Sequence, residues 1–287
     1  MNEYEIVTDS GCDIDAKLLK KWGVLYSPLS FRFEDGKEHF NDEMDSAEFF
    51  ARMRAGEVSK TSAVNSDSFI TLFEKVLSEG KDVLYIGFSS GISCTFNSAR
   101  IAAEEMGDKY PERSVVTVDT LAASAGQGLL LYYAVEKKKQ GASLSENEEY
   151  IRSIMNNLAH WFTVEDLVYL KRGGRVSAAA ALAGGVLGIK PVMHVDDEGH
   201  LLNVMKVRGR GASIRALAKK YSDTALDPEN GDYFISHGDC MDDAKALEEM
   251  IFTAHNKKCS LITNIGAVIG SHSGPGTLAL FFLAKER

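Results

Sequence analysis

The sequence predicts an α/β protein with two domains: a three-layer α/β/α domain with a parallel sheet, then a two-layer α/β domain with a mixed, largely antiparallel sheet. Short apolar strands alternate with amphipathic helices through the first half, which is typical of a parallel sheet covered on both faces. In the second half two strand-like runs are joined by a turn at residues 196–199, which indicates antiparallel pairing. With 287 residues, 45% of them hydrophobic, the chain is long enough to bury a core in each domain.

The first domain is expected to span residues 1–158. It begins with an apolar strand at residues 4–8 and a helix around residues 16–22. Residues 24–33 then alternate like a strand, and Asp35-Gly36 predicts a hairpin turn that returns through residues 37–40 as an arm or lid. Further strands are expected at 83–88 and 114–118, with helices at 46–54, 66–79, 94–106, 124–139 and 145–158.

The second domain is expected to span residues 159–287. The sequence predicts that its helices cover one face of a sheet. The strands are expected at 159–163, 189–195, 201–207, 232–236, 259–263 and 265–270, and the helices at 211–221, 242–254 and 275–284.

Charge and hydropathy narrow the class of protein. The net charge of −9 argues against a nucleic-acid partner that covers the whole surface. The first residues lack the basic flank and apolar run of a signal peptide, and no stretch approaches 18 apolar residues. We therefore expect a soluble cytoplasmic protein without an integral membrane segment. The four cysteines show no paired spacing and are expected to be reduced thiols.

Three segments rich in hydroxyl groups and glycine stand out, at residues 60–62, 89–95 and 271–277. The last two are expected where an apolar strand passes into a helix, and Pro275 suits the first turn of such a helix. A helix start has N–H groups without intrahelical partners and partial positive charge, so it can bind a carboxylate or phosphate. The sequence therefore predicts an anion site.

The segment at residues 89–95 allows more than one interpretation. Gly87-Phe88-Ser89-Ser90-Gly91 fits the Gly-x-Ser-x-Gly motif of α/β-hydrolases, with Ser89 as the nucleophile of an esterase. Alternatively, the segment supplies an anion site through its hydroxyls and Gly91, or Ser93 simply caps the helix. The hydroxyl residues available to an anion are Ser90, Ser93 and Thr95.

The segment at residues 60–62 precedes a helix whose cap is expected to be Asn65 or Ser66. Thr61 and Ser62 are then not needed as caps, and they either contact an anion or are exposed loop hydroxyls. His272 either donates to the same anion or has a structural role.

Basic residues gather in two short stretches of this acidic chain. They form either a docking or phosphate-binding patch, which could recognise a partner protein, or a solvated face. The residues are Lys171, Arg172, Arg175, Lys206, Arg208 and Arg210.

No metal or nucleotide cofactor is predicted. His237, Cys240, His255 and Cys259 have spacings loosely typical of zinc ligands, but local geometry does not imply that they converge. The sequence also lacks the phosphate-loop and dinucleotide-binding fingerprints.

The motifs occur in an order that resembles the DegV family, fatty-acid-binding proteins that carry acyl chains for a separate bacterial fatty acid kinase. The resemblance spans nearly the whole chain and rests on residues 7–10, 61–62, 90–95, 118–120, 170–175, 188–191, 207–208 and 272–276. It implies a long-chain fatty acid in an apolar tunnel between the two domains, without catalysis by this chain and without a cofactor.

The resemblance also implies roles for individual residues. Thr61 and Ser93 are expected to contact the fatty-acid carboxylate. The kinase would phosphorylate that carboxylate to an acyl phosphate, a precursor in phospholipid metabolism. Residues expected to support the head group are Ser62, Ser90, Gly91, Thr95, His272 and Gly274, and those expected to face the kinase are Arg172, Arg175 and Arg208.

Overall fold

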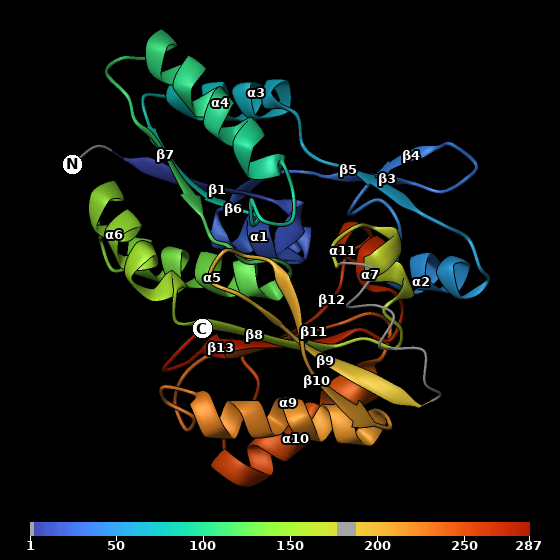
Figure 1. Cartoon of the computed structure of the whole chain (residues 1–287). Helices are drawn as coiled ribbons and strands as arrows, with labels where there is room; N and C mark the ends of the chain where they lie inside the picture. Colours follow the sequence, from blue (N-terminus) through green and yellow to red (C-terminus); the bar gives the residue numbers. More distant parts are fainter. Residues whose placement is uncertain (1–2, 177–187) are drawn as a thin grey trace.

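A four-stranded parallel sheet forms the centre of the first half of the chain (Figure 1). The computed structural model describes residues 3–176 and 188–287. The strand order is β2-β1-β6-β7, and neighbouring strands all run parallel. The strands are β1 (Tyr4–Asp9), β2 (Leu25–Ser27), β6 (Asp82–Gly87) and β7 (Val115–Asp119).

Helices cover both faces of this parallel sheet. On one face α3 (Ser66–Leu77) and α4 (Thr95–Lys109) pack against strand residues such as Tyr85. On the other face lie α1 (Ala16–Trp22), α5 (Ala125–Lys139) and α6 (Leu144–Met155). The helix starts are fixed locally: Asn65 accepts from the Ser68 N–H, as predicted, and Ser143 forms a capping box with Glu146. The predicted α/β/α layers are confirmed.

A six-stranded mixed sheet forms the second half, in the order β10-β9-β8-β13-β11-β12. All neighbours are antiparallel except β11 and β12, which confirms the predicted mixed, largely antiparallel sheet. The strands are β8 (Leu158–Thr163), β9 (Ile189–Val195), β10 (Leu201–Arg208), β11 (Tyr233–His237), β12 (Leu261–Asn264) and β13 (Leu278–Leu283).

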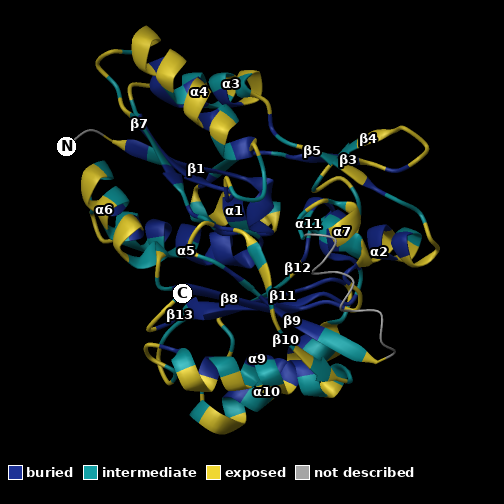
Figure 2. Cartoon of the chain, viewed as in Figure 1, coloured by how far each residue is buried: buried dark blue, intermediate teal, exposed yellow. Residues whose placement is uncertain are grey.

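The layers follow one another from α3 and α4 at one end of the molecule to α9 (Arg210–Thr224) and α10 (Met241–His255) at the other (Figure 1). Helix α5 lies between the two sheets, and Figure 2 shows it and strands β1, β8 and β13 as largely buried. One buried cluster therefore contains side chains of both halves. The proposed domain boundary between residues 158 and 159 stays a prediction.

A small third sheet, β4-β3-β5, lies beside the main layers. The predicted hairpin around Asp35-Gly36 is confirmed, because β3 (Ser30–Arg32) pairs with β4 (Glu38–Phe40). The predicted strand at 24–33 is instead divided between β2 and β3, in different sheets. Strand β5 (Lys60–Ser62) pairs with the other side of β3, and helix α11 (Ala267–Ser273) contacts both strands. Helix α11 also contacts α2 (Ser46–Arg54) and α7 (Val168–Arg172), while the short helix η1 (Ser10–Cys12) follows β1. Thr61 and Ser62 thus belong to a strand and not to a loop.

The prediction for residues 265–284 is wrong. The expected strand at 265–270 is mostly helix α11, and the expected helix at 275–284 contains strand β13. Pro275 therefore follows a helix end and does not begin a helix. Gly274 and Gly276, with φ of 82° and 75°, turn the chain between these elements. Residues 271–277 consequently provide no helix start for an anion.

Among residues 3–176 and 188–287, no helix is long and apolar enough to cross a bilayer. The four cysteines are free.

Candidate functional site

A cavity of about 650 Å³ lies between the parallel sheet and the mixed sheet. The loops that follow β6 and β7 form one side, at the carboxyl ends of these strands, where α/β sheets commonly bind ligands. Strands β8 and β13 and helix α11 form the opposite side. The volume lies within the range of small-molecule sites, about 300–1,000 Å³.

Most of the cavity wall is apolar. Strand alternation produces this surface on the mixed sheet: Phe162 of β8 and Ala279 of β13 are register partners and both line the cavity. The other apolar lining residues are Leu29, Ala63, Phe88, Ile92, Ala123, Leu170, Val195, Leu201, Ile265, Val268, Ile269 and Phe281. Such a wall suits a hydrocarbon chain.

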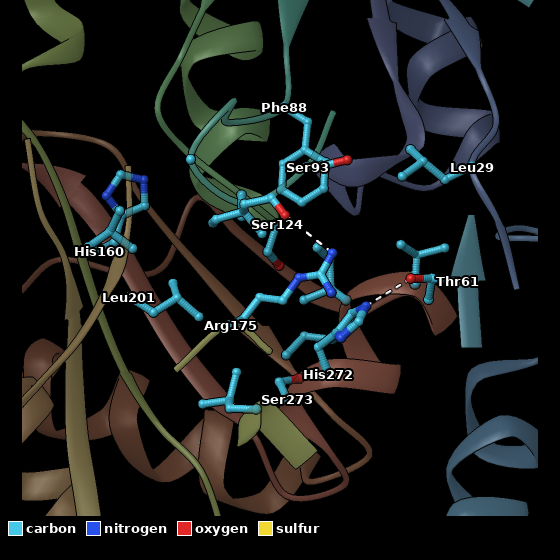
Figure 3. Close-up of a pocket in the computed structure, with 18 of the residues that line it drawn as sticks. Leu29, Thr61, Phe88, Ser93, Ser124, His160, Arg175, Leu201, His272 and Ser273 are labelled. Atoms are coloured by element: carbon cyan, nitrogen blue, oxygen red, sulfur yellow. Dashed lines mark hydrogen bonds between the residues drawn. The ribbon is translucent and has the colours of Figure 1, made fainter. Parts of the chain in front are cut away.

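Polar groups from distant parts of the sequence meet at one end of the cavity (Figure 3). Thr61 on β5 and His272 on α11 form a hydrogen bond, with 2.8 Å between Oγ1 and Nε2. Burial, followed by the charge of Arg175, lowers the pKa of His272 to about 4. The ring is therefore neutral at pH 7. Its Nδ1 faces Gly173, where a Cβ atom would lie only 2.1 Å away.

The loop between β6 and α4 places a second set of hydroxyls in the cavity wall. Ser93 Oγ lies 2.9 Å from Thr95 Oγ1 and accepts from the Thr95 N–H at 3.2 Å. The predicted helix cap at Ser93 is not formed, because the N-cap of α4 is Cys94 and has no side-chain cap hydrogen bond. Gly91 has no room for a side chain, because a Cβ atom there would lie 2.6 Å from the carbonyl oxygen of Glu198. The turn between β9 and β10 therefore packs directly on this loop.

Arg175 brings a positive charge to the same end of the cavity. Figure 3 shows its side chain beside His272. Its Nη2 donates to the carbonyl oxygen of Ile92 at 3.3 Å, and Nη1 donates to Gly173. Burial lowers its pKa, but a guanidinium stays protonated in proteins. Within residues 3–176 and 188–287 it forms no ion pair with a carboxylate, so an anionic ligand would be attracted here.

Comparison with known proteins assigns the chain to a family. A family model described as "DegV family" matches residues 3–285. The chain belongs to the DegV family. A DegV domain-containing protein of Clostridium perfringens is 41% identical over 100% of this chain and 99% of its own. One of Lactococcus lactis is 32% identical over 99% of this chain and 98% of its own.

Solved DegV structures share this fold, and several are described as binding fatty acids. The fatty-acid-binding DegV family protein of Thermus thermophilus is 28% identical, with a TM-score of 0.89, over 99% of this chain and 100% of its own. A protein of Thermotoga maritima, whose structure revealed a fatty-acid-binding function, is 28% identical with a TM-score of 0.85 over the same shares.

The DegV chain gathers some of the predicted residues and separates others. Thr61, Ser93, His272 and Arg175 line the cavity, together with Ser62, Ser90 and Gly91. The remaining predicted residues do not line it. Thr95 is buried behind Ser93, Gly274 packs against Tyr169, Arg172 lies over the Tyr169 ring, and Arg208 is exposed at the end of β10.

The geometry does not favour Ser89 as a nucleophile. Ser89 is fully buried, is not part of the cavity wall and donates to the carbonyl oxygen of Gly199 at 3.2 Å. Its hydroxyl also accepts from Gly91, and its φ is not positive, unlike the strained serine of a nucleophile elbow. Among the described residues no group of three or more candidate metal ligands converges either, so the zinc-like spacings do not form a site there.

Three polar residues of the cavity wall lie outside the segments that the sequence singles out, namely Asn97, Ser124 and His160. Ser124 precedes α5 in a strained conformation, with φ of 55°. Its hydroxyl donates to Asp13, whose pKa burial raises to about 7. His160 shares the cavity face of β8 with Phe162, and this alternation within 159–163 was the available signal.

Proposed function

We propose that this DegV chain binds one long-chain fatty acid in the cavity, with its carboxylate at Thr61 and Ser93. The observation that carries the proposal is the Arg175 guanidinium, which has no carboxylate partner among the described residues and lies at one end of a mostly apolar cavity. A molecule with one negative end and a long hydrocarbon tail matches this distribution of charge.

The tail and the head group have different energetic roles. Each buried methylene contributes about 0.8 kcal/mol, so about fourteen methylenes contribute roughly 11 kcal/mol before ordering costs. Hydrogen bonds to a charged group contribute only about 1.5–3 kcal/mol each and must first offset desolvation of the carboxylate. The tail thus supplies most of the affinity, and the hydroxyls fix the orientation.

Native mass spectrometry of the purified protein, followed by extraction in organic solvent, tests the binding. We expect a co-purifying fatty acid in wild type. The double variant Thr61→Ala/Ser93→Ala should bind fatty acid at least about tenfold more weakly, since it loses two hydrogen bonds to a charged group. Ser98→Ala, an exposed hydroxyl on α4, is the matched control. Equal affinity in the double variant and the control would remove Thr61 and Ser93 from the site.

The second part of the proposal is that the chain presents the fatty acid to a separate fatty acid kinase, without catalysis of its own. Two arginines flank the end of the cavity proposed to hold the carboxylate. Arg175 lines the cavity, and Arg172 lies at the end of α7, three residues before it. Acyl phosphate, trapped with hydroxylamine, should form only when kinase, ATP and loaded protein are combined. Arg172→Gln should slow this transfer while fatty acid affinity stays unchanged, and unaltered transfer would exclude Arg172 from the kinase contact.

A further inference from the structure

A second cavity, of about 370 Å³, lies where the last turns of α5 meet α6 and the chain before β11 (Figure 1). Its wall consists of Tyr132, Tyr133, Glu136, Lys137, Gln140, Tyr150 and Asp232. None of these residues lines the first cavity. Along α5 the step from Ser124, in the first cavity, to Glu136 covers about 18 Å at the helical rise per residue. The second cavity is therefore a separate site.

Helical spacing brings the α5 residues of this cavity to one face of the helix. Tyr132, Glu136 and Gln140 follow one another at intervals of four residues, and Gln140 is exposed, so the cavity is open to solvent. The Tyr132 ring has its centroid 5.7 Å from that of Tyr133 and 5.8 Å from that of Phe234 on β11. Packing thus holds the aromatic part of the wall in place.

The Asp232 carboxylate is the central charge of the second cavity. After the larger effect of burial, it raises the pKa of Tyr132, Tyr133 and Tyr150, which places it near all three phenol groups. The phenols therefore stay protonated at pH 7. Asp232 Oδ1 accepts from the Ser260 hydroxyl at 2.6 Å, and among residues 3–176 and 188–287 the carboxylate forms no ion pair. A negative charge in the wall thus lacks a cation.

The other charged groups of the wall do not neutralise Asp232. Glu136 pairs with Lys139, with 2.7 Å between Oε1 and Nζ. Lys137 Nζ lies 5.1 Å from the centroid of the Tyr150 ring, within the range of a cation–π contact. This contact shows that an ammonium group can reach the ring. Because a lysine ammonium is carried on a flexible four-carbon stem, a ligand can displace it.

The chemistry of the wall selects an organic ammonium group. Such a group has up to three N–H donors, which the carboxylate and the phenol oxygens can accept, and the tyrosine rings attract its charge. An anion would be repelled by Asp232 and Glu136. No group of three or more candidate metal ligands occurs in the described part of the chain. The volume is many times the roughly 30 Å³ of one water molecule, so it leaves room for an aliphatic chain beside the ammonium group.

We propose that the second cavity binds a small molecule with a primary ammonium group on a short aliphatic chain, with the ammonium group between Asp232 and the Tyr150 ring. This site does not depend on the proposed fatty acid binding. It gives the chain a second ligand of opposite charge, bound at the other end of α5.

Chemical-shift titration of the full chain with butylammonium chloride at pH 7 tests the inference, and 1-butanol serves as the uncharged ligand control. We expect saturable shifts of the backbone amides of residues 132–140 with butylammonium, and at least tenfold weaker binding of butanol. Asp232→Asn should weaken butylammonium binding at least about tenfold, since it loses a hydrogen bond between two charged groups. Asp108→Asn, at an exposed carboxylate on α4, is the matched control and should retain wild-type affinity.

Lys137→Met separates the ligand from the cation of the chain itself. It removes a competitor for the Tyr150 ring, so butylammonium should bind as tightly as in wild type or more tightly. Binding in Lys137→Met but not in wild type would mean that Lys137 occupies the site, and it would overturn the inference. Equal affinity in Asp232→Asn and Asp108→Asn, or equal binding of butylammonium and butanol to wild type, would also overturn it. Fatty acid affinity should be unchanged in Asp232→Asn, so these results leave the proposed function standing.

Discussion

Gly173 offers a test of the head-group site that changes no polar side chain. It follows α7 with φ of −74°, which alanine adopts without strain. A Cβ atom at this position would lie 2.1 Å from His272 Nδ1, whereas ordinary contact begins near 3.4 Å. In Gly173→Ala the ring must therefore move by roughly 1.3 Å. Such a movement can break the 2.8 Å hydrogen bond between His272 and Thr61.

The size of the effect follows from two contributions. Overpacking of this kind costs about 1–3 kcal/mol of the free energy of unfolding. Displacement of Thr61 and His272 from the carboxylate should weaken fatty acid binding about tenfold, the loss expected for one hydrogen bond to a charged group. Isothermal titration with a fatty acid measures the affinity, and urea unfolding measures the stability.

Two further variants separate these contributions. Gly107→Ala on α4 has no atom within 4 Å of the added Cβ and should retain affinity while stabilising the helix slightly. Gly173→Ala combined with His272→Ala should recover stability, because the clash is gone, but not affinity. Wild-type affinity and stability in Gly173→Ala alone would refute the assignment of His272 to the head-group site.

Two other outcomes follow from buried titratable groups. His272 has a pKa of about 4 in the folded chain, whereas its ordinary pKa is 6.5, so the unfolded chain binds more protons between these pH values. The unliganded protein should therefore lose stability as the pH falls from 6.5 to 4. Urea unfolding of His272→Asn should show a smaller loss of stability, and an equal loss would contradict this origin. Tyr85→Phe removes the 2.6 Å hydrogen bond to buried Asp9 and should lower the free energy of unfolding by about 1–3 kcal/mol. The control Tyr110→Phe removes the half-buried hydrogen bond to Glu74 and should change the free energy of unfolding by less than about 0.5 kcal/mol. Equal changes in the two variants would contradict the role of burial.

Much of the fold could be predicted because its signals are local. Helix α3 has an amphipathic pattern and a cap at Asn65, and both can be read within a dozen residues. Residues 278–283 carry no such signal, since Leu-Ala-Leu-Phe-Phe-Leu is apolar throughout and suits a buried helix as well as a buried strand. Only its pairing with β8 and β11, far away in the sequence, makes it a strand.

The candidate site divides in the same way. Thr61, Ser93 and His272, which line the cavity, can be predicted because each lies in a short motif, and the order of these motifs resembles one family. His160 lies in no motif, and its importance depends on which face of β8 turns toward the other sheet. Arg172, Arg175 and Arg208 look equivalent in sequence, yet only Arg175 lines the cavity.

The central place of β13 in the mixed sheet has a consequence for biosynthesis. This strand follows the other strands of the sheet in the chain, and it separates β8 from β11. The parallel sheet is encoded before residue 120 and can assemble while the ribosome is still extending the polypeptide. The mixed sheet must wait until residue 283 emerges, so a nascent chain stalled before β13 should be unable to form the cavity proposed to bind a fatty acid.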